Sequence, residues 1–326
     1  MTTATIAPAR TTPARPRQAR WLLRLHRPAL YTWAALVVAL AAALLALHGP
    51  LADAAADGWR QYNACTTPRC RYDQSAIIRY KDAYNWLTYA LDALPLLVAA
   101  WAGATLTARE LETGTARLAW TQAASPARWL AVRLAVPAVL VTAGTSLLFW
   151  LHRLAWEAGR GRIDTRKSWY DIWTFHANGP TIAALALAGL AAGALAGLLV
   201  RRTLPALALG TAVTLGVQSL AQQLMPHLWP TVTQVSDLKA GGPTGVGISL
   251  GQGLVTRTGA RLPLPDCLSE TQCDAALRRA HAVGYFNTYH PASHYWPLQL
   301  LTTALLLTAA ALLALASFRV LRRLTS

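Results

Sequence analysis

The stretch IAALALAGLAAGALAGLLV, residues 182–200, contains only Ala, Leu, Gly, Ile and Val. A helix of about 20 mostly apolar residues spans the roughly 30 Å hydrocarbon core of a bilayer. Gly189, Gly193 and Gly197 recur every four residues, which places small residues on one helix face and lets another backbone come close. We favour packing within one subunit for this face, and a dimer contact is the alternative.

The rest of the chain has the composition of a multi-pass membrane protein. Of its 326 residues, 54% are hydrophobic and only 13% are charged, whereas soluble domains contain about 25% charged residues. Six windows are long and apolar enough to span a bilayer, at about 29–48, 86–106, 130–151, 180–200, 204–225 and 297–318. The predicted fold class is therefore an all-α integral membrane protein with six transmembrane helices.

Basic residues decide the predicted orientation, because Lys and Arg gather at the cytoplasmic ends of spanning helices. The arm 1–28 contains six arginines and no acid, and the basic tail 319–326 contains three more. Both termini are therefore predicted to be cytoplasmic. This leaves 49–85, 152–179 and 226–296 as outer loops, of which the first and last are large.

The net charge of +16 has a bearing on partners. The excess positive charge is mainly cytoplasmic and favours contact with anionic membrane lipid. A pI of about 10.6 in a membrane protein mostly restates the orientation rule, so we expect no nucleic-acid partner.

The N-terminal residues are predicted to form a disordered basic arm followed by a short interfacial helix. The arm is rich in Thr, Ala, Pro and Arg without periodicity, and residues 20–28 separate apolar from basic side chains around a helical turn. Arginines, an apolar run and then LADAAADG also resemble a signal peptide. The run is too long for a typical signal core, so we favour an uncleaved first helix.

All four cysteines lie in predicted outer loops, Cys65 and Cys70 in the first, Cys267 and Cys273 in the last. Short local pairs in an oxidising compartment are typical of disulfides. Each would restrict the unfolded state by about 2 kcal/mol in the chain-entropy account. A four-thiolate zinc site, free thiols and a cross pairing of Cys65 with Cys267 stay open as alternatives.

Three polar residues within the predicted helices form a candidate polar pathway. Asp92 lies near the outer end of the second helix, and Gln218 and Gln222 lie towards the outer end of the fifth. A carboxylate inside a membrane is a functional candidate by default. The alternatives are that Asp92 reaches water at the boundary and that the glutamines face the loop.

No motif in the chain points to catalysis. No stretch matches the Gly-rich phosphate-binding loop that ends in Lys-Ser or Lys-Thr. His152 and Glu157 are five residues apart and do not share a helix face, and the histidines of the last loop lack a nearby carboxylate. The glycine-rich stretch 241–253 is predicted to be flexible loop. We therefore expect no enzyme activity, no cofactor and no metal site in this chain.

The segment 106–134, LTARELETGTARLAWTQAASPARWLAVRL, is more structured than a connector requires. Its pattern predicts a short helix up to Gly114, a restart at Thr115 and an apolar face that includes Trp120. Ser125, followed by proline, predicts the start of the next helix. We interpret the segment as a docking element.

Residues 108–134, ARELETGTARLAWTQAASPARWLAVRL, resemble the segment that follows the second helix in ABC transporter permeases of the ABC-2 exporter type, particularly an actinobacterial branch. There an acidic-Gly-Thr motif precedes Trp-Thr-Gln and Ser-x-x-Arg-Trp. YHPASHYWPLQ, residues 289–299, is similar to the aromatic-Pro start of the last helix in that family, although His294 stands where the branch would have arginine. The resemblance covers nearly the whole chain.

The resemblance implies the membrane-spanning permease subunit of an ATP-driven exporter in the bacterial plasma membrane. Such a subunit pairs with a separate ATP-binding subunit, which binds ATP and Mg, and with a second permease subunit as a homodimer or heterodimer. The segment after the second helix would be a coupling helix seated in the ATPase. The docking residues expected here are Glu110, Glu112, Gly114, Thr115, Trp120, Arg128 and Trp129.

Two functions from other classes remain as alternatives. A non-transporting membrane sensor or immunity protein would keep the same architecture without ATP-coupled flux. A membrane-embedded enzyme would require polar residues clustered near the bilayer surface, and the sequence shows only scattered ones.

Overall fold

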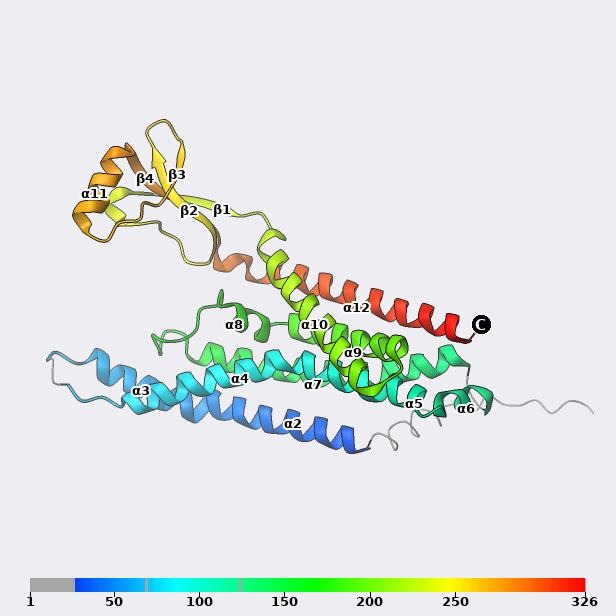
Figure 1. Cartoon of the computed structure of the whole chain (residues 1–326). Coiled ribbons are helices and arrows are strands. Elements are labelled where there is room, and N and C mark those ends of the chain that lie inside the picture. Colours follow the sequence, from blue (N-terminus) through cyan, green and yellow to red (C-terminus); the bar gives the residue numbers. More distant parts are fainter. Residues whose placement is uncertain (1–26, 68–69, 123–124, 326) are drawn as a thin grey trace, which may run out of the picture.

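A computed structural model describes residues 27–67, 70–122 and 125–325 of the chain (Figure 1). The predicted arm and most of the predicted interfacial helix, residues 1–26, lie outside the described residues. The described part confirms six helical runs that are long and apolar enough to cross a membrane.

The six long helices form an elongated bundle with two different ends (Figure 1). They are α2 (Arg27–Ala46), α4 (Gln74–Trp101), α7 (Pro126–Ala158), α9 (Thr181–Val200), α10 (Thr203–Leu224) and α12 (Tyr295–Thr325). One end, called the tail end here, holds the start of α2, the turn between α9 and α10, and the C-terminus. The opposite end carries a small β-sheet and is called the sheet end.

Several helices extend well beyond their predicted bounds. α2 continues through the π-helical turn η1 (Leu47–Leu51) into α3 (Ala52–Asn63), and α4 already begins at Gln74. The predicted outer loop 49–85 is therefore mostly helical. Hydropathy marks only the length of helix that lies in hydrocarbon, so the polar turns that continue a helix outside it were taken for loop.

The same correction applies to the predicted loop 152–179. α7 continues to Ala158, and a short helix, α8 (Ile172–Ala177), precedes α9. Asp171 caps α8, because its side chain accepts a hydrogen bond from the backbone N–H of Thr174 at 3.0 Å.

At the tail end, α4 passes through the π-helical turn η2 (Ala102–Ala108) into α5 (Arg109–Glu112). The run Gln74–Glu112 is thus one continuous helical rod of 39 residues. At 1.5 Å per residue the rod is about 58 Å long, which exceeds the 40–45 Å of a bilayer with its headgroups.

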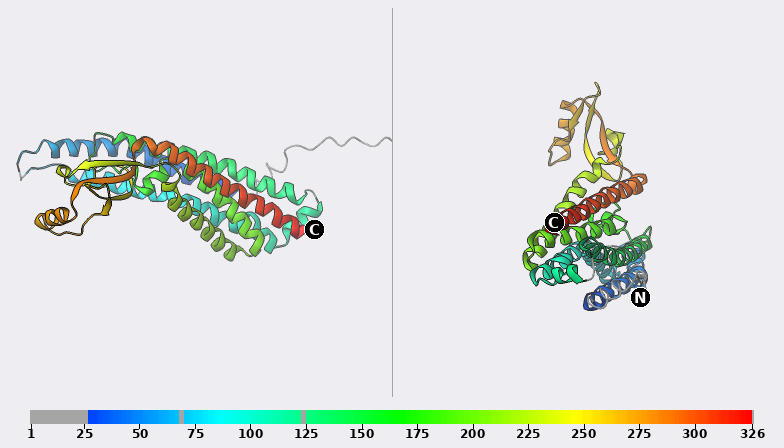
Figure 2. Two further views of the ribbon diagram at one scale, coloured as in Figure 1. Left: turned by 90° about the horizontal axis from the view of Figure 1, so that it is seen from above. Right: turned by 90° about the vertical axis from the view of Figure 1, so that its right-hand side faces the viewer.

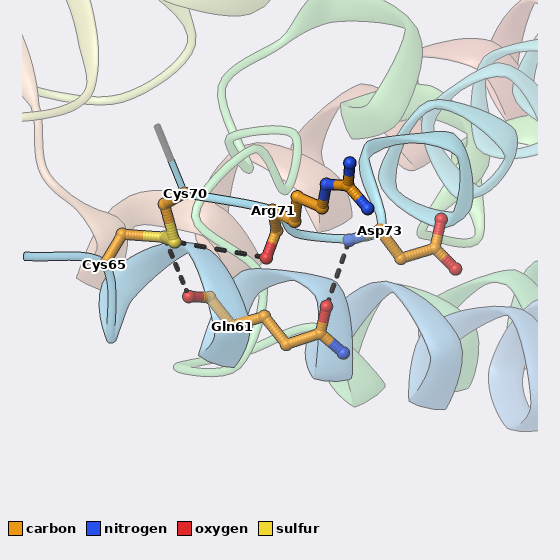
Figure 3. The surroundings of a disulfide bond; sticks show 5 residues. All are labelled: Gln61, Cys65, Cys70, Arg71 and Asp73. Carbon is orange, nitrogen blue, oxygen red and sulfur yellow. Dashed lines mark hydrogen bonds between the residues drawn. A yellow bond between two sulfur atoms is a disulfide. The ribbon is translucent and has the colours of Figure 1, made fainter. Parts of the chain in front are cut away.

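A tight turn joins α3 to α4 at the sheet end (Figure 3). A disulfide links Cys65 to Cys70, with 5.7 Å between their Cα atoms. The backbone N–H of Asp73 donates to Oε1 of Gln61 at 3.0 Å, and its carboxylate accepts from the N–H of Ala76 at 2.9 Å, which caps α4. A hydrogen bond from the Ser75 hydroxyl lowers the pKa of Asp73.

The predicted last loop, 226–296, is in fact a folded unit. It contains a four-stranded antiparallel sheet in the order β1-β4-β2-β3 and a helix. These elements are β1 (Val232–Asp237), β2 (Ile248–Thr256), β3 (Arg261–Pro263), α11 (Glu270–Arg279) and β4 (Ala282–His290). Part of the glycine-rich stretch 241–253 belongs to β2, so the prediction of a flexible loop there was wrong.

The sheet forms because β4 has a buried face. Tyr285, Asn287 and Tyr289 alternate along the strand and are all buried, as expected for one face of a half-buried strand. The second disulfide ties Cys267, just before α11, to Cys273 in the first turn of that helix, with 5.3 Å between Cα atoms. Both cysteine pairs are thus at disulfide distance as local pairs, which is the pairing that the sequence favoured.

α9 is the centre of the bundle and packs against α4, α7, α10 and α12. Viewed along the bundle, α2 lies at one edge (Figure 2, right). The three spaced glycines of α9 face α4 and η2: a Cβ at Gly189 would lie 2.6 Å from the carbonyl oxygen of Pro95, and one at Gly193 would overlap that of Ala99. The glycine face therefore packs inside the subunit, as the sequence favoured.

Candidate functional site

The candidate site is the segment between α4 and α7 at the tail end. α5 ends at Glu112, and α6 (Thr115–Gln122) begins after a two-residue break. Gly114 has φ +75° with open space around it, a left-handed conformation that glycine adopts without strain. The predicted break at Gly114 and restart at Thr115 are both present.

Glu110 forms a buried ion pair with Arg133 of α7. Their side chains are 16% and 4% exposed, and the N–O distance is 2.5 Å. The guanidinium also donates to the carbonyl of Leu106 at 3.0 Å and lies 4.5 Å from the centre of the Trp129 ring. Removal of one partner from a buried pair leaves an uncompensated charge, so this contact ties α5 firmly to α7.

Glu112 makes the second tie, to the start of α10. Its Oε2 accepts from the backbone N–H of Thr203 at 3.0 Å and from the Thr203 hydroxyl at 2.5 Å. The first N–H groups of a helix lack partners within the helix, and a carboxylate there is favoured by the helix dipole. Glu112 thus caps a helix that begins 91 residues later.

These two ties differ from the expectation that both carboxylates face a partner protein. In this conformation each carboxylate is bonded within the chain, so docking contacts would have to come from other side chains. Several exposed basic residues at the tail end form no ion pair with any residue that the structure describes, among them Arg109, Arg128, Arg201 and Arg202. The free charge of this surface is therefore positive.

The tryptophans of the segment pack inward. Trp129 is 6% exposed, and its ring meets that of Trp120 edge-on, with the centroids 5.6 Å apart. Both rings join a cluster that includes Leu130 and Leu321. Trp120 therefore fixes α6 onto α7 and α12, and the exposed positions of the predicted set are Glu112, Gly114, Thr115 and Arg128.

The start of α7 matches its sequence signal. Ser125 is the N-cap, and its hydroxyl accepts from the N–H of Arg128 at 3.4 Å, with proline at the first helical position. This start places Arg133 two turns into α7, beside η2. Arg133 is the residue that the sequence analysis missed, although a lone arginine within a predicted spanning helix was a signal for a buried partner.

The predicted polar pathway is buried in the bundle. Asp92 is 6% exposed, Gln218 is 7% exposed, and Gln222 is half-buried. Among the described residues, no hydrogen-bond partner reaches Oδ2 of Asp92 or Oε1 of Gln218.

Packing around Gly189 brings Asp92 and Gln218 to one depth. Gly189 faces both Pro95 of α4 and Thr214 of α10. Asp92 lies about one turn before Pro95, and Gln218 lies one turn after Thr214, both towards the sheet end. The structure therefore places two acceptor oxygens without a hydrogen-bond partner among the described residues, Oδ2 of Asp92 and Oε1 of Gln218, at a similar depth of the bundle beside α9. They belong to α4 and α10, which contact each other.

A second polar cluster, nearer the sheet end, was not found from the sequence. Nδ1 of His152 lies 2.6 Å from Oδ1 of Asn178, and its Nε2 lies 2.9 Å from the hydroxyl of Thr88. The Tyr295 hydroxyl donates to the carbonyl of Asn178 at 2.8 Å, and Gln299 donates to that of Phe175. These contacts join α4, α7, α8 and α12.

His176 of α8 belongs to the same region. It is 3% exposed, and burial lowers its pKa to about 4. Its backbone carbonyl accepts from the hydroxyl of Thr181, the first residue of α9, at 3.1 Å. A buried neutral histidine therefore supports the start of the central helix.

His290 and His294 contact each other just before α12. Nδ1 of His290 lies 3.1 Å from Nδ1 of His294, and Nε2 of His290 lies 2.8 Å from the carbonyl of Pro226. Within the described part of the chain, no third His, Cys, Asp or Glu completes a ligand set. The pair joins the end of α10 to the start of α12.

Comparison with known proteins gives one match. The sequence profile of a family described as ABC-2 membrane transporter related matches residues 34–225, which is more than half of the chain and includes the segment described above. No curated protein and no solved structure gives a significant match.

Proposed function

Because the chain belongs to the ABC-2 membrane transporter related family, we propose that it is the membrane-spanning permease subunit of an ATP-driven exporter. The chain is a multi-pass membrane protein of six long apolar helices. In the proposal, a separate subunit binds and hydrolyses ATP, a second permease subunit completes the transporter, and the cargo is unidentified. The observation that carries the proposal is the pair of ties from Glu110 and Glu112.

The proposed orientation puts the tail end in the cytoplasm of a bacterium and the sheet end outside its plasma membrane. Exposed basic residues gather at the tail end, as at cytoplasmic helix ends, and both disulfides lie at the sheet end, as in an oxidising compartment. Exposed aromatic side chains mark the outer membrane boundary, because Trp and Tyr favour that interface. These residues are Trp86, Tyr89, Trp150, Trp173 and Trp296.

The two ties explain how the segment would transmit motion. α5 continues the rod of α4, Glu110 holds α7, and Glu112 holds the start of α10. A protein that pushes on α5 and α6 would therefore move three spanning helices together. The carboxylates serve as internal ties in this mechanism, and Arg109 and Arg128 would meet acidic groups of the ATP-binding subunit through charge-assisted contacts.

A co-purification experiment separates docking from transmission. The chain is co-expressed with the ATP-binding subunit encoded beside its gene, and subunit recovery and ATP hydrolysis are measured after purification from membranes. We expect Arg109→Glu plus Arg128→Glu to lose the ATP-binding subunit. Glu110→Gln should retain that subunit but lower its hydrolysis about tenfold, because the tie to α7 is broken.

The matched control reverses two exposed arginines at the sheet end, Arg257→Glu plus Arg278→Glu, and should behave as wild type. Full recovery and hydrolysis in the Arg109 and Arg128 variant would refute the docking surface. If no ATP-binding subunit co-purifies with the wild-type chain, the alternative function, a non-transporting sensor or immunity protein, is favoured.

A further inference from the structure

A groove between α2, α4 and α7 has no role in the function proposed above. Its volume is about 360 Å³. Apolar side chains of the three helices line it, among them Leu30, Leu36, Leu97, Val136, Pro137 and Leu140. We propose that this groove binds an acyl chain of an anionic phospholipid, whose headgroup lies at Arg27.

The groove results from one close contact between two helices. At Gly144 of α7, a Cβ would lie 2.8 Å from the ring of Trp33 and 3.0 Å from the side chain of Val37, so α2 and α7 touch there. Towards the tail end, α7 presents Leu140 and then Pro137, whose compact ring fills little of the space to α2. The cavity lies in this part, one to two turns from the contact.

Two polar groups of the lining already donate hydrogen bonds within the protein. The indole N–H of Trp33 donates to the carbonyl of Leu140 at 3.3 Å, and the hydroxyl of Thr32 donates to the carbonyl of Pro28 at 2.9 Å. A buried water needs two to four polar partners, and an empty space forfeits dispersion contacts. Hydrocarbon is therefore the filling that this surface favours.

The depth of the groove fits one leaflet. Leu30 and Leu36 lie three and nine residues after Arg27, or about 4 to 14 Å along α2. Half of the hydrocarbon core is about 15 Å thick. An acyl chain from the leaflet at the tail end therefore reaches the whole groove.

The charges beside the groove select the headgroup. Arg27 at the start of α2 is exposed, and the first turn of that helix contains no acid. The nearest acids of the adjacent segment, Glu110 and Glu112, are already bonded to Arg133 and Thr203. An anionic phosphate thus meets uncompensated positive charge at the mouth of the groove.

Occupancy of this site has a consequence for the segment. The lining includes Leu97, Val98 and Trp101, which lie in the last turns of α4 directly before η2. A bound chain would hold the last turns of α4 against α2 and α7. The lipid would thereby stabilise the position from which the segment makes its two ties.

The test counts lipids bound to the purified chain by native mass spectrometry after reconstitution with phosphatidylglycerol or phosphatidylcholine. Val136→Trp fills the groove, and Val139→Trp adds the same bulk to the lipid-facing side of α7, where Val139 is 69% exposed. We expect wild type and Val139→Trp to retain one phosphatidylglycerol. The amount bound to Val136→Trp should be at least tenfold lower. Arg27→Gln should lower the preference for phosphatidylglycerol about fivefold.

Equal lipid retention in the two tryptophan variants would overturn the proposal. A gain of bound lipid in Leu22→Ser plus Leu25→Ser would also overturn it, because the arm of the chain would then be the occupant. Thermal melting of both tryptophan variants shows whether they are folded. If Val136→Trp is not folded, the Arg27→Gln variant decides, and an unchanged preference of that variant for phosphatidylglycerol refutes the site. No step requires ATP or a partner subunit, so the result is independent of the proposed export function.

Discussion

α2 and α9 have nearly the same hydropathy and opposite places in the bundle. The most apolar windows of their helical runs have mean hydropathies of 2.3 and 2.2, yet 11% of the first window and 83% of the second are buried inside the protein. The difference lies in side-chain size. Each helix contains eight alanines, but α9 also has three glycines, which let other backbones approach it. α2 has no glycine, carries Tyr31 and Trp33, and lies at the edge.

The largest expected effect is overpacking of the central helix. Gly193→Leu would drive a side chain into the backbone of Ala99 and Gly103, and we expect it to destabilise the bundle by about 3 kcal/mol. Thermal melting followed by size-exclusion chromatography measures this loss. Ala35→Leu on the exposed side of α2 is the control and should melt as wild type; equal melting of both variants would refute the central place of α9.

The second prediction concerns pH at the sheet end of α9. Burial holds the pKa of His176 at about 4, below its value of about 6.5 in an unfolded chain. Between these values the unfolded chain binds the proton more readily, so stability is complete above pH 6.5 and falls as the pH falls towards 4. We expect a loss of about 2 kcal/mol at pH 5.

Melting curves at pH 7.5 and pH 5 check this loss. His176→Gln should melt with a weaker pH dependence than wild type, whereas His48→Gln, at an exposed histidine of η1, should not differ from wild type. An identical pH dependence in wild type and His176→Gln would contradict the assignment.

A smaller effect is expected where α2 meets the bundle. Gly144→Leu would displace Trp33 and Val37 and separate α2 from α7, at a cost of about 1 to 2 kcal/mol. The effect is smaller than at Gly193 because side chains of an edge helix can move towards lipid. Tryptophan fluorescence and melting measure it, with Ala143→Leu on the lipid-facing side of α7 as the control. A loss as large as that of Gly193→Leu would mean that α2 is as central as α9.

The smallest expected effect is at the tail end of the α9–α10 pair. Thr203→Val removes the hydroxyl that donates to Glu112 and leaves the backbone N–H in place. We expect a decrease in melting temperature below that of Gly144→Leu, because the contact is exposed. Thr211→Val is the matched control, since its hydroxyl bonds to the carbonyl of Leu207 within α10. No difference between these variants would show that the tie adds nothing to stability.

The spanning helices could be predicted from the sequence, together with both ends of α9 and α10 and the start of α7, whereas the other ends could not. Long apolar windows identify helices that cross hydrocarbon, but α3 and the first turns of α4 are polar and read as loop. The sheet was missed because β2 contains glycines and follows a glycine-rich stretch, so its residues were taken for loop. The alternation of Tyr285, Asn287 and Tyr289 was the available signal.

The candidate site was predicted in its local structure and not in its contacts. Ser125, Gly114 and Thr115 act through neighbours in the sequence, so their roles were readable. The partners of Glu110 and Glu112 lie 23 and 91 residues away, and no local pattern reports such pairs. The half-buried position of Trp120 likewise depends on α12, which lies nearly 200 residues further along the chain.

The rod from Gln74 to Glu112 also links the two ends of the bundle directly. One helix runs from the disulfide-closed turn at the sheet end to the two ties at the tail end. A tilt or shift of the sheet end of this helix would thereby displace its tail end without a relay through other helices. The two ends of the molecule therefore share a single mechanical element.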